Sequence, residues 1–231
     1  MGRILSVVSG KGGVGNTVTA LNLAASLNNK GKEVLLVDGN LSNPEIYTYL
    51  GAKDLQCSFH DVLQNKTHFS NLVHEHSSGL KVVPSTPRSE IFSDRKTFRD
   101  KIFDMKNHSD FLIIDSAAGL SHESIAAIES SQTLLLVTTP EETAVESLKK
   151  VLAVATDLKK EVLGVVVNQV GLHKHEVSES EISQVLQVPV IEKVPFDLKV
   201  KHSHKLKHPV VHSHPTSKSS KRFERITTRF I

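Results

Sequence analysis

The sequence alternates between short apolar runs and longer stretches in which apolar residues recur every three or four positions. Uninterrupted apolar runs are typical of strands buried on both faces, as in a parallel sheet, and the intervening stretches are typical of amphipathic helices. This alternation predicts an α/β fold, in which helices cover both faces of a doubly wound, mostly parallel sheet. The expected strands lie at residues 4–8, 33–37, 80–84, 111–114, 132–138 and 162–167.

Local rules predict several helices and some of their boundaries. A helix is expected after the first strand, and Gly31 predicts its end. Residues 87–106 are charged and have apolar residues at helical intervals, which predicts one or two amphipathic helices. Pro140 suits the first position of a later helix, and Thr139 together with Glu142 predicts a capping box there.

Composition limits the class of protein. With 231 residues, 39% of them hydrophobic, the chain can bury one sizeable core, so residues 1–231 are expected to form a single domain. Cys57 is the only cysteine, which excludes an intrachain disulfide and a metal site built from several cysteines of one chain. The N-terminus shows no signal-peptide pattern, and the apolar runs are far shorter than the ~18–20 residues of a membrane span. We expect a cytoplasmic protein, peripheral at a membrane at most.

Charge is distributed unevenly along the chain. Residues 193–231 contain ten lysine and arginine residues against two carboxylates, a net charge of +8, whereas residues 1–192 carry −5. A basic region on an acidic body suggests an anionic partner, either DNA or a membrane surface, and solvated charge without a partner is the alternative. Near the C-terminus, Phe223, Ile226 and Phe230 share one helical face. We favour docking of this face on the protein's own sheet over insertion into a membrane.

The sequence contains four histidine pairs with His-x-His spacing. On a strand, this spacing places both rings on one face, where they could hold a metal ion. The pairs fall in expected loops or in a basic helix, and no cysteine accompanies them, so we favour a solvated surface. The four pairs are His74/His76, His173/His175, His202/His204 and His212/His214.

The chemistry is concentrated in the stretch Ser9-Gly10-Lys11-Gly12-Gly13-Val14-Gly15-Asn16-Thr17, which joins the first expected strand to the first helix. Its four glycines permit backbone conformations that other residues avoid, and they turn several N–H groups toward one point. That point lies at a helix N-terminus, where the dipole and the free amides favour an anion. Thr17 is placed to bind a magnesium ion that bridges phosphates. The stretch predicts a loop that binds a polyphosphate, and a glycine turn without a ligand is the alternative.

One position departs from the general pattern G-x-x-x-x-G-K-[ST], since Asn16 stands where a lysine is expected. An asparagine amide can donate a hydrogen bond, but it is shorter than lysine and uncharged. The loss of a charge-assisted contact costs about 1.5–3 kcal/mol, which corresponds to about one to two orders of magnitude in nucleotide affinity or turnover. We therefore expect slow turnover or none.

Two aspartates, Asp38 and Asp115, each follow an expected buried strand. A carboxylate at the C-terminal end of a parallel strand lies at the edge of the sheet where ligands bind. Both are placed to hold magnesium through water, and Asp38 is also placed to hold an attacking water. For either aspartate alone, a helix cap or a loop position is the alternative.

The segment Lys11-Gly12-Gly13-Val14-Gly15 resembles the deviant phosphate loop of the MinD/ParA family of dimerising P-loop ATPases. The resemblance extends from Arg3 to about Val211. It implies a P-loop NTPase fold, binding of ATP or ADP with Mg²⁺, and an ATP-bound homodimer in which Lys11 reaches across the interface to the partner's nucleotide. The segment Asp38-Gly39-Asn40, with Pro44 after it, is similar to archaeal MinD-type proteins, although members usually carry an aspartate at the position of Asn40.

The resemblance also implies roles for individual residues. Gly119 matches the glycine of the second switch, whose amide senses the terminal phosphate, and Asn168 matches the residue that contacts adenine. Catalysis would involve Lys11, Asp38 and Asn40, and the metal would be held by Thr17, Asp38 and Asp115. The nucleotide-binding residues implied in this way are Gly10, Lys11, Gly12, Gly13, Val14, Gly15, Asn16, Thr17, Gly119, Asn168, Pro195, Phe196 and Asp197.

These features lead to one functional hypothesis and two alternatives. The hypothesis is an ATP-binding molecular switch, with weak or no ATP hydrolysis, that dimerises with nucleotide and acts in intracellular positioning or in the regulation of the cell-division site through an unknown regulatory protein. The first alternative is a non-catalytic scaffold of the same fold. The second is a partition-type protein that binds DNA nonspecifically through residues 193–231.

Overall fold

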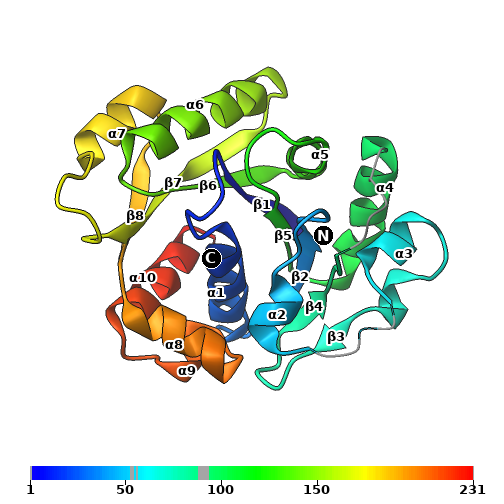
Figure 1. The fold of residues 1–231 in the computed structure, drawn as a ribbon. Helices are drawn as coiled ribbons and strands as arrows, with labels where there is room; N and C mark the ends of the chain where they lie inside the picture. Colours follow the sequence, from blue (N-terminus) through cyan, green and yellow to red (C-terminus); the bar gives the residue numbers. More distant parts are fainter. Residues whose placement is uncertain (1, 53–54, 56, 88–93, 231) are drawn as a thin grey trace.

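A twisted eight-stranded sheet forms the centre of the computed structural model, which describes residues 2–52, 55, 57–87 and 94–230 (Figure 1). The strand order is β3-β4-β2-β5-β1-β6-β7-β8, and every neighbouring pair is parallel except β3 with β4. The expected doubly wound, mostly parallel sheet is therefore confirmed. Its strands are β1 (Arg3–Ser9), β2 (Val34–Gly39), β3 (His74–Glu75), β4 (Lys81–Val83), β5 (Phe111–Ser116), β6 (Thr133–Thr138), β7 (Glu161–Val170) and β8 (Val190–Pro195).

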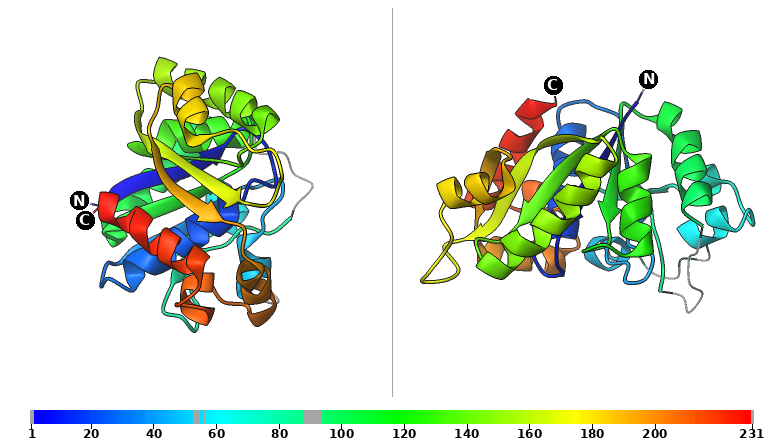
Figure 2. Two further views of the ribbon diagram at one scale, coloured as in Figure 1. Left: turned by 90° about the vertical axis from the view of Figure 1, so that its left-hand side faces the viewer. Right: turned by 90° about the horizontal axis from the view of Figure 1, so that it is seen from above.

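Helices cover both faces of the sheet, as the views in Figure 2 also show. Helix α1 and the C-terminal helices lie on one face, and α4 to α7 lie on the other. Each face of the sheet packs against a hydrophobic core, because successive side chains along a strand point to opposite faces. In β1, Leu5 and Val7 face α1, while Ile4 and Val8 face the opposite side. The helices are α1 (Asn16–Asn28), α2 (Ile46–Leu50), α3 (Phe59–Leu63), α4 (Arg95–Met105), α5 (His122–Ser130), α6 (Glu142–Asp157), α7 (Glu179–Leu186), α8 (Leu198–Leu206), α9 (Val210–Ser213) and α10 (Lys218–Ile226), with 3₁₀ turns at Phe69–Asn71, Lys106–His108 and Thr227–Arg229.

The two edge strands are the ones that the apolar pattern does not predict. Strand β3 is only two exposed residues long, and β8 carries Glu192 and Lys193 within its length. Of the helical region expected at 87–106, α4 accounts for Arg95–Met105, and residues 88–93 lie outside the described part of the chain. Within the described part, no helix combines the length and the apolar character needed to cross a membrane.

The capping box predicted at Thr139 and Glu142 is wrong. Helix α6 begins at Glu142, two residues later than expected, and its N-cap residue is Glu141, whose side chain makes no capping hydrogen bond. Instead, the Thr139 hydroxyl donates to Glu141 Oε1 at 3.1 Å. The late start of the helix leaves the Glu141 carboxylate available to a residue of the glycine loop.

The C-terminal helix docks on the protein's own core, as expected. Phe223 and Ile226 of α10 are buried in the cluster that contains α1, and Phe230 packs against it. The neighbouring arginines also face the protein: Arg222 and Arg225 contact the buried carboxylate of Glu192, at 3.1 and 3.3 Å. Part of the basic charge of residues 193–231 is therefore used inside the fold.

Truncation of Phe223 tests this docking. Because the ring is fully buried, we expect Phe223→Ala to lower the free energy of unfolding by about 3–5 kcal/mol in a urea titration. Lys221→Ala, on an exposed position of the same helix, is the matched control and should change it by less than about 0.5 kcal/mol. Equal stability of the two variants would contradict the docked arrangement.

Candidate nucleotide-binding site

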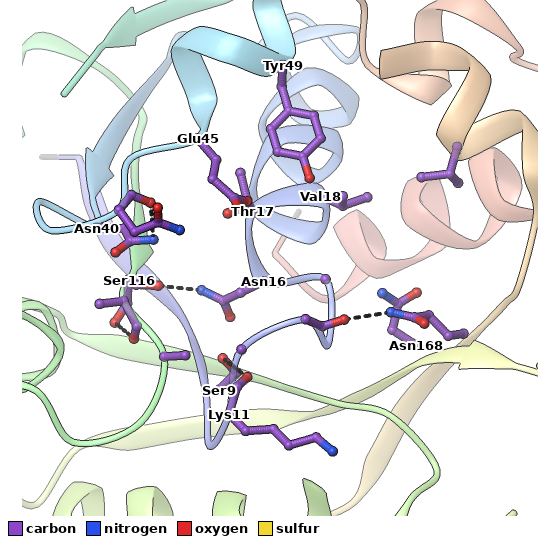
Figure 3. Close-up of a pocket in the computed structure, with 18 of the residues that line it drawn as sticks. Ser9, Lys11, Asn16, Thr17, Val18, Asn40, Glu45, Tyr49, Ser116 and Asn168 are labelled. Atoms are coloured by element: carbon purple, nitrogen blue, oxygen red, sulfur yellow. Dashed lines mark hydrogen bonds between the residues drawn. The ribbon is translucent and has the colours of Figure 1, made fainter. Parts of the chain in front are cut away.

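A cavity of about 580 Å³ opens at the carboxyl ends of the central strands (Figure 3). The glycine loop after β1 forms its floor, the segments after β2 and β5 form one side, and the segments after β7 and β8 form the other. Strand register brings the predicted carboxylates together, because Asp38 of β2 is paired directly with Asp115 of β5. Ligand binding at this edge is the rule for doubly wound sheets.

The glycine loop is packed closely between two parts of the chain. A Cβ atom at Gly10 would lie 2.2 Å from the backbone nitrogen of Leu148 in α6, and one at Gly15 would lie 2.1 Å from Nδ2 of Asn168. Gly15 also has a φ of +90° and is the N-cap residue of α1. Only glycine satisfies both requirements there, so the loop reaches the N-terminus of α1 in the geometry that favours an anion.

The Asn16 amide points beneath the loop. Its Nδ2 atom lies 2.9 Å from the carbonyl oxygen of Val7 and 3.1 Å from Oδ1 of Asp115. The same atom lies 2.8 Å from the carbonyl oxygen of Ser116, the contact drawn in Figure 3. The Oδ1 atom of Asn16 is buried without a hydrogen-bond partner. The two N–H groups of this amide are thus already directed at protein acceptors, so a phosphate contact from Asn16 would require its side chain to turn.

Two fully buried carboxyl groups, those of Asp38 and Asp115, lie side by side at the ends of β2 and β5, behind the residues that line the cavity. Burial raises the pKa of Asp38 well above its usual value, and the neighbouring Asp115 raises it further. Burial likewise raises the pKa of Asp115 to about 7, although hydrogen bonds from the Thr17 hydroxyl and the Asn16 amide partly oppose this change. Oδ2 of Asp115 is buried without a partner. Such a pair disfavours two negative charges unless a cation is nearby.

The donor set fits Mg²⁺, which prefers oxygen ligands and retains several waters. The Thr17 hydroxyl and the carboxylates of Asp38 and Asp115 are oxygen donors, and the orphaned Oδ2 of Asp115 offers a site for a metal-bound water. Among the described residues, no cluster of three or more His, Cys, Asp or Glu side chains is arranged to hold a metal ion. An ion here would therefore be held mainly by phosphate, Thr17 and water.

The segments after β2 and β5 are tied to the rest of the site by hydrogen bonds. Nδ2 of Asn40 donates to the carbonyl oxygen of Asn43 at 2.7 Å, and the backbone N–H of Ser42 donates to Glu123 Oε2 at 3.0 Å. The N–H of Gly119 donates to the carbonyl oxygen of Ser9 at 2.8 Å. The phosphate-sensing role expected of the Gly119 amide would require this hydrogen bond to open.

The predicted adenine side holds the glycine loop in place. Asn168, labelled in Figure 3, is buried near the end of β7. Its Nδ2 donates to the carbonyl oxygen of Val14 at 2.8 Å, and Nε2 of Gln169 donates to that of Gly13 at 2.9 Å. Pro195, Phe196 and Asp197 line the cavity next to them. The structure therefore brings the two predicted halves of the site together, whereas the Val14 side chain is buried in the core and contributes only its backbone.

Lys11 lies on the rim and is held by its own chain. Its Nζ is 2.9 Å from Glu141 Oε2 and 3.2 Å from the hydroxyl of Thr143. The Lys11 hydrogen bond holds the pKa of Glu141 below its usual value. His173 adds a second contact, with Nε2 at 3.7 Å from Glu141 Oε1. The side chains of Lys11 and Glu141 are 35% and 38% exposed, so this ion pair is partly screened by solvent.

Several lining residues escape the sequence analysis. Glu45 and Tyr49, around α2, and His204 of α8 line the cavity, and the rings of Tyr49 and His204 are in edge contact with centroids 4.2 Å apart. Burial raises the pKa of Tyr49 to about 12. These side chains fall in no motif, so only the fold reveals them. Glu141 could have been noticed, because it follows Pro140 at the end of a predicted strand.

Comparison with known proteins places this geometry in a family. A family model described as ParA, NUBPL iron-transfer P-loop NTPase, matches residues 1–231. An uncharacterized ATP-binding protein of Methanocaldococcus jannaschii is 28% identical over 100% of this chain and 88% of its own length. The septum site-determining protein MinD of Synechocystis is 29% identical over 99% of this chain and 89% of its own length.

Solved structures agree with this relationship. The cell division ATPase MinD of Pyrococcus furiosus superimposes with a TM-score of 0.94 at 30% identity, covering 100% of this chain and 98% of the other. MinD of Pyrococcus horikoshii, solved in complex with Mg-ADP, superimposes with a TM-score of 0.94 at 29% identity, covering 100% and 96%. The chain therefore belongs to the ParA/MinD family of P-loop NTPases.

Proposed function

We propose that this protein is a nucleotide-operated switch that binds ATP or ADP with Mg²⁺ in the cavity and hydrolyses ATP slowly or not at all. The observation that carries the proposal is the position of Asn16: the loop retains its glycines and Thr17, but the amide that replaces the lysine is bonded to Val7 and Ser116. Binding of Mg-ADP by the Pyrococcus horikoshii relative supports the choice of ligand.

Residues 10–17 would surround the phosphates, because their backbone N–H groups converge at the N-terminus of α1. Thr17 would bind magnesium directly, and Asp38 and Asp115 would hold its waters. The ion would supply charge neutralisation between the phosphates. Asn40 can orient an attacking water but cannot accept its proton, so a carboxylate such as Asp38 would have to accept it.

Lys11 would supply the cationic contact that the loop otherwise lacks. In the family arrangement it would cross to the nucleotide of a second copy, so the contact with Glu141 must first be broken. An exposed ion pair of this kind stabilises by only about 0–1 kcal/mol, which ATP-dependent dimerisation can readily overcome. The switch would therefore exchange an internal partner of Lys11 for an external one.

The switch would be read by a regulatory protein in intracellular positioning, and cell-division relatives support this context. A membrane or DNA as an additional anionic partner rests on the net charge of residues 193–231, of which Arg222 and Arg225 are already paired with Glu192. Iron transfer, named in the description of the matched family model, receives no support from the single cysteine of the chain. A scaffold without turnover is the outcome if nucleotide binds and no phosphate is released.

Restoring the lysine tests the role of Asn16. We expect Asn16→Lys to raise the affinity for Mg-ATP by about tenfold to a hundredfold, because a charge-assisted contact of about 1.5–3 kcal/mol is regained. Isothermal titration calorimetry with a non-hydrolysable ATP analogue measures this directly. Asn16→Ala, which removes the amide without adding charge, is the control and should not gain affinity. Equal affinity of the native chain and Asn16→Lys would contradict the proposal.

Glu141 tests the exchange of partners by Lys11. Glu141→Gln weakens the internal ion pair, so we expect the ATP-bound dimer to form up to about fivefold more readily in sedimentation velocity, the equivalent of about 1 kcal/mol. Glu142→Gln removes the neighbouring carboxylate and serves as the matched control. Lys11→Ala should abolish the dimer while ATP still binds. A dimer that survives Lys11→Ala would refute the predicted role of this lysine.

Asp115 gives a pH-dependent prediction for the nucleotide-free protein. Because its folded pKa lies above the unfolded value, its contribution to stability is complete below about pH 4 and is lost as the pH rises through about 7. Asp115→Asn should therefore raise the melting temperature at pH 8 and flatten its decline between pH 5 and pH 8. Added Mg-ADP should stabilise the native chain more than the variant, because Asp115 would hold a water of the ion. A variant less stable than the native chain at pH 8 would show that the carboxyl is not under strain.

A further inference from the structure

Six histidines lie where α8 and α9 pack against the rest of the protein, in two contacting sets and one single ring: His202 with His214, His76 with His208 and His212, and His204 against Tyr49. Five of the chain's thirteen histidines fall within residues 202–214, and His76 at the end of β3 meets them. The expected solvated surface is wrong for His76, which is only 7% exposed. We call this group the histidine seam; it consists of His76, His202, His204, His208, His212 and His214.

One contact in the seam requires a neutral ring. Nδ1 of His202 lies 3.0 Å from Nε2 of His214, so one imidazole must donate a hydrogen bond to the lone pair of the other. Protonation of both rings would remove that lone pair and place two cationic rings in contact, with the two nitrogens 3.0 Å apart. This contact closes α8 onto the end of α9 and is therefore lost when both rings are charged.

The second half of the seam depends on neutral rings as well. Nδ1 of His76 accepts from the backbone N–H of Ser78 at 3.2 Å, and the His76 ring is in edge contact with that of His208, with centroids 4.8 Å apart. His212 uses Nε2 against Oδ1 of Asn29, at 2.7 Å, and its Nδ1 is buried without a partner. Protonation would give His212 a buried Nδ1–H that no neighbour accepts, and a protonated Nδ1 of His76 could no longer accept from the N–H of Ser78.

The charges around the seam are mostly of one sign. Nearby positive or protonatable groups disfavour a proton on each ring: His74, His208 and His212 act on His76, His208 acts on His212, and Lys207 acts on His204. His202 and Lys199 act in the same way on His214, whereas Asp197 favours its protonation. Burial is the largest cause, and with these charges it holds the pKa values of His76, His204, His212 and His214 below the usual value.

The elements against which α8 and α9 pack supply little negative charge. Helix α1 has no charged residue between Asn16 and Asn28. On β3, Glu75 alternates with the two histidines and so points to the opposite side of the strand. On the side of α2, Glu45 acts on Tyr49 rather than on His204, and the arginines of α10 are directed at Glu192.

The seam also borders the cavity. Val200, Lys201 and His204 of α8 line it, and Asp197 caps the start of the same helix by accepting from the N–H of Lys199 at 2.9 Å. Any loosening of α8 therefore changes one wall of the candidate nucleotide site.

We propose that α8 and α9 form an acid-released wall of the cavity: in mild acid the histidine seam takes up protons, its ring-to-ring contacts break, and the two helices separate from β3, α1 and α2. The separation is a property of this chain's own residues. Its effect on a bound nucleotide rests, in addition, on the proposed function.

The direction of the pH dependence follows from linkage. The packed state holds the pKa values of His76, His204, His212 and His214 below the usual value, whereas in the released state these histidines titrate near the ordinary value of about 6.5. The packing is therefore complete above about pH 6.5 and weakens as the pH falls below it. Each of these four histidines favours release by about tenfold for every unit of pH below 6.5, until its own folded value is reached.

Hydrogen exchange followed by mass spectrometry tests the release in the full chain without nucleotide. After correction for the intrinsic pH dependence of exchange, we expect peptides from residues 198–214 to lose protection by about tenfold or more between pH 7.5 and pH 5.5. Peptides from α5 and α6 should keep theirs. Equal protection of residues 198–214 at both pH values, or a uniform loss over the whole chain, would overturn the proposal.

A variant pair assigns the effect to the seam. His202→Gln combined with His214→Gln retains hydrogen-bonding side chains that cannot take up a proton, so the loss of protection should shrink to about threefold or less. His122→Gln combined with His175→Gln, at two exposed positions away from the seam, is the control and should keep the full loss. An equal reduction in both pairs would overturn the assignment.

Histidine titration by NMR keeps the test independent of how any variant folds. In the native chain, the Cε1–H resonances of His76, His204, His212 and His214 should titrate below pH 6.5. Mg-ADP should dissociate faster at pH 5.5 than at pH 7.5 if the wall opens. Failure to bind Mg-ADP at pH 7.5 would refute the proposed function, while the exchange measurement would still decide on the seam.

Discussion

The pairing of two carboxyl groups at the end of β2 and β5 is the constraint on which the site depends. Asp38 and Asp115 are fully buried and adjacent in the sheet, and burial raises the pKa of both. Hydrogen bonds partly stabilise the two carboxylates: the Asn16 amide donates to Asp115, and the backbone N–H groups of Asn40 and Ile46 donate to Asp38. The glycine loop, the segments after both strands and α1 are thereby organised around a point that favours a cation and its attached anion.

Most of the fold and the outline of the site could be predicted from the sequence, because each rests on a local signal. Apolar runs revealed the central strands, and the glycine stretch revealed the floor of the cavity. Side-chain direction was beyond reach: nothing in the sequence shows that the amide of Asn16 turns beneath the loop or that Glu141 holds Lys11. The predicted capping box is wrong for a related reason, because the Thr139 hydroxyl donates a hydrogen bond to the Glu141 side chain and does not cap the helix backbone.

The parts of the cavity wall formed by α2 and α8 could not be predicted from the sequence. Tyr49 and His204 are more than 150 positions apart, and they meet only because α8 packs across α2. The sequence favoured a solvated surface for the histidines near them because they fall in expected loops or in a basic helix, and these local signals say nothing about burial. Their partners come from distant segments: His212 contacts Asn29 at the end of α1, and His76 contacts His208. Contacts between distant segments thus determine both the shape of the cavity and the ionisation of its surroundings.

The docking of α10 on α1 has a consequence for how the chain is made. Every residue of α1 from Thr17 to Leu27 is buried, and much of that cover comes from Val210, Phe223 and Ile226 near the other end of the sequence. During synthesis the apolar first helix is therefore exposed until α10 has left the ribosome. Nascent chains interrupted before α10 would present this surface to chaperones or to one another, and the emergence of α10 would be the event that completes the core.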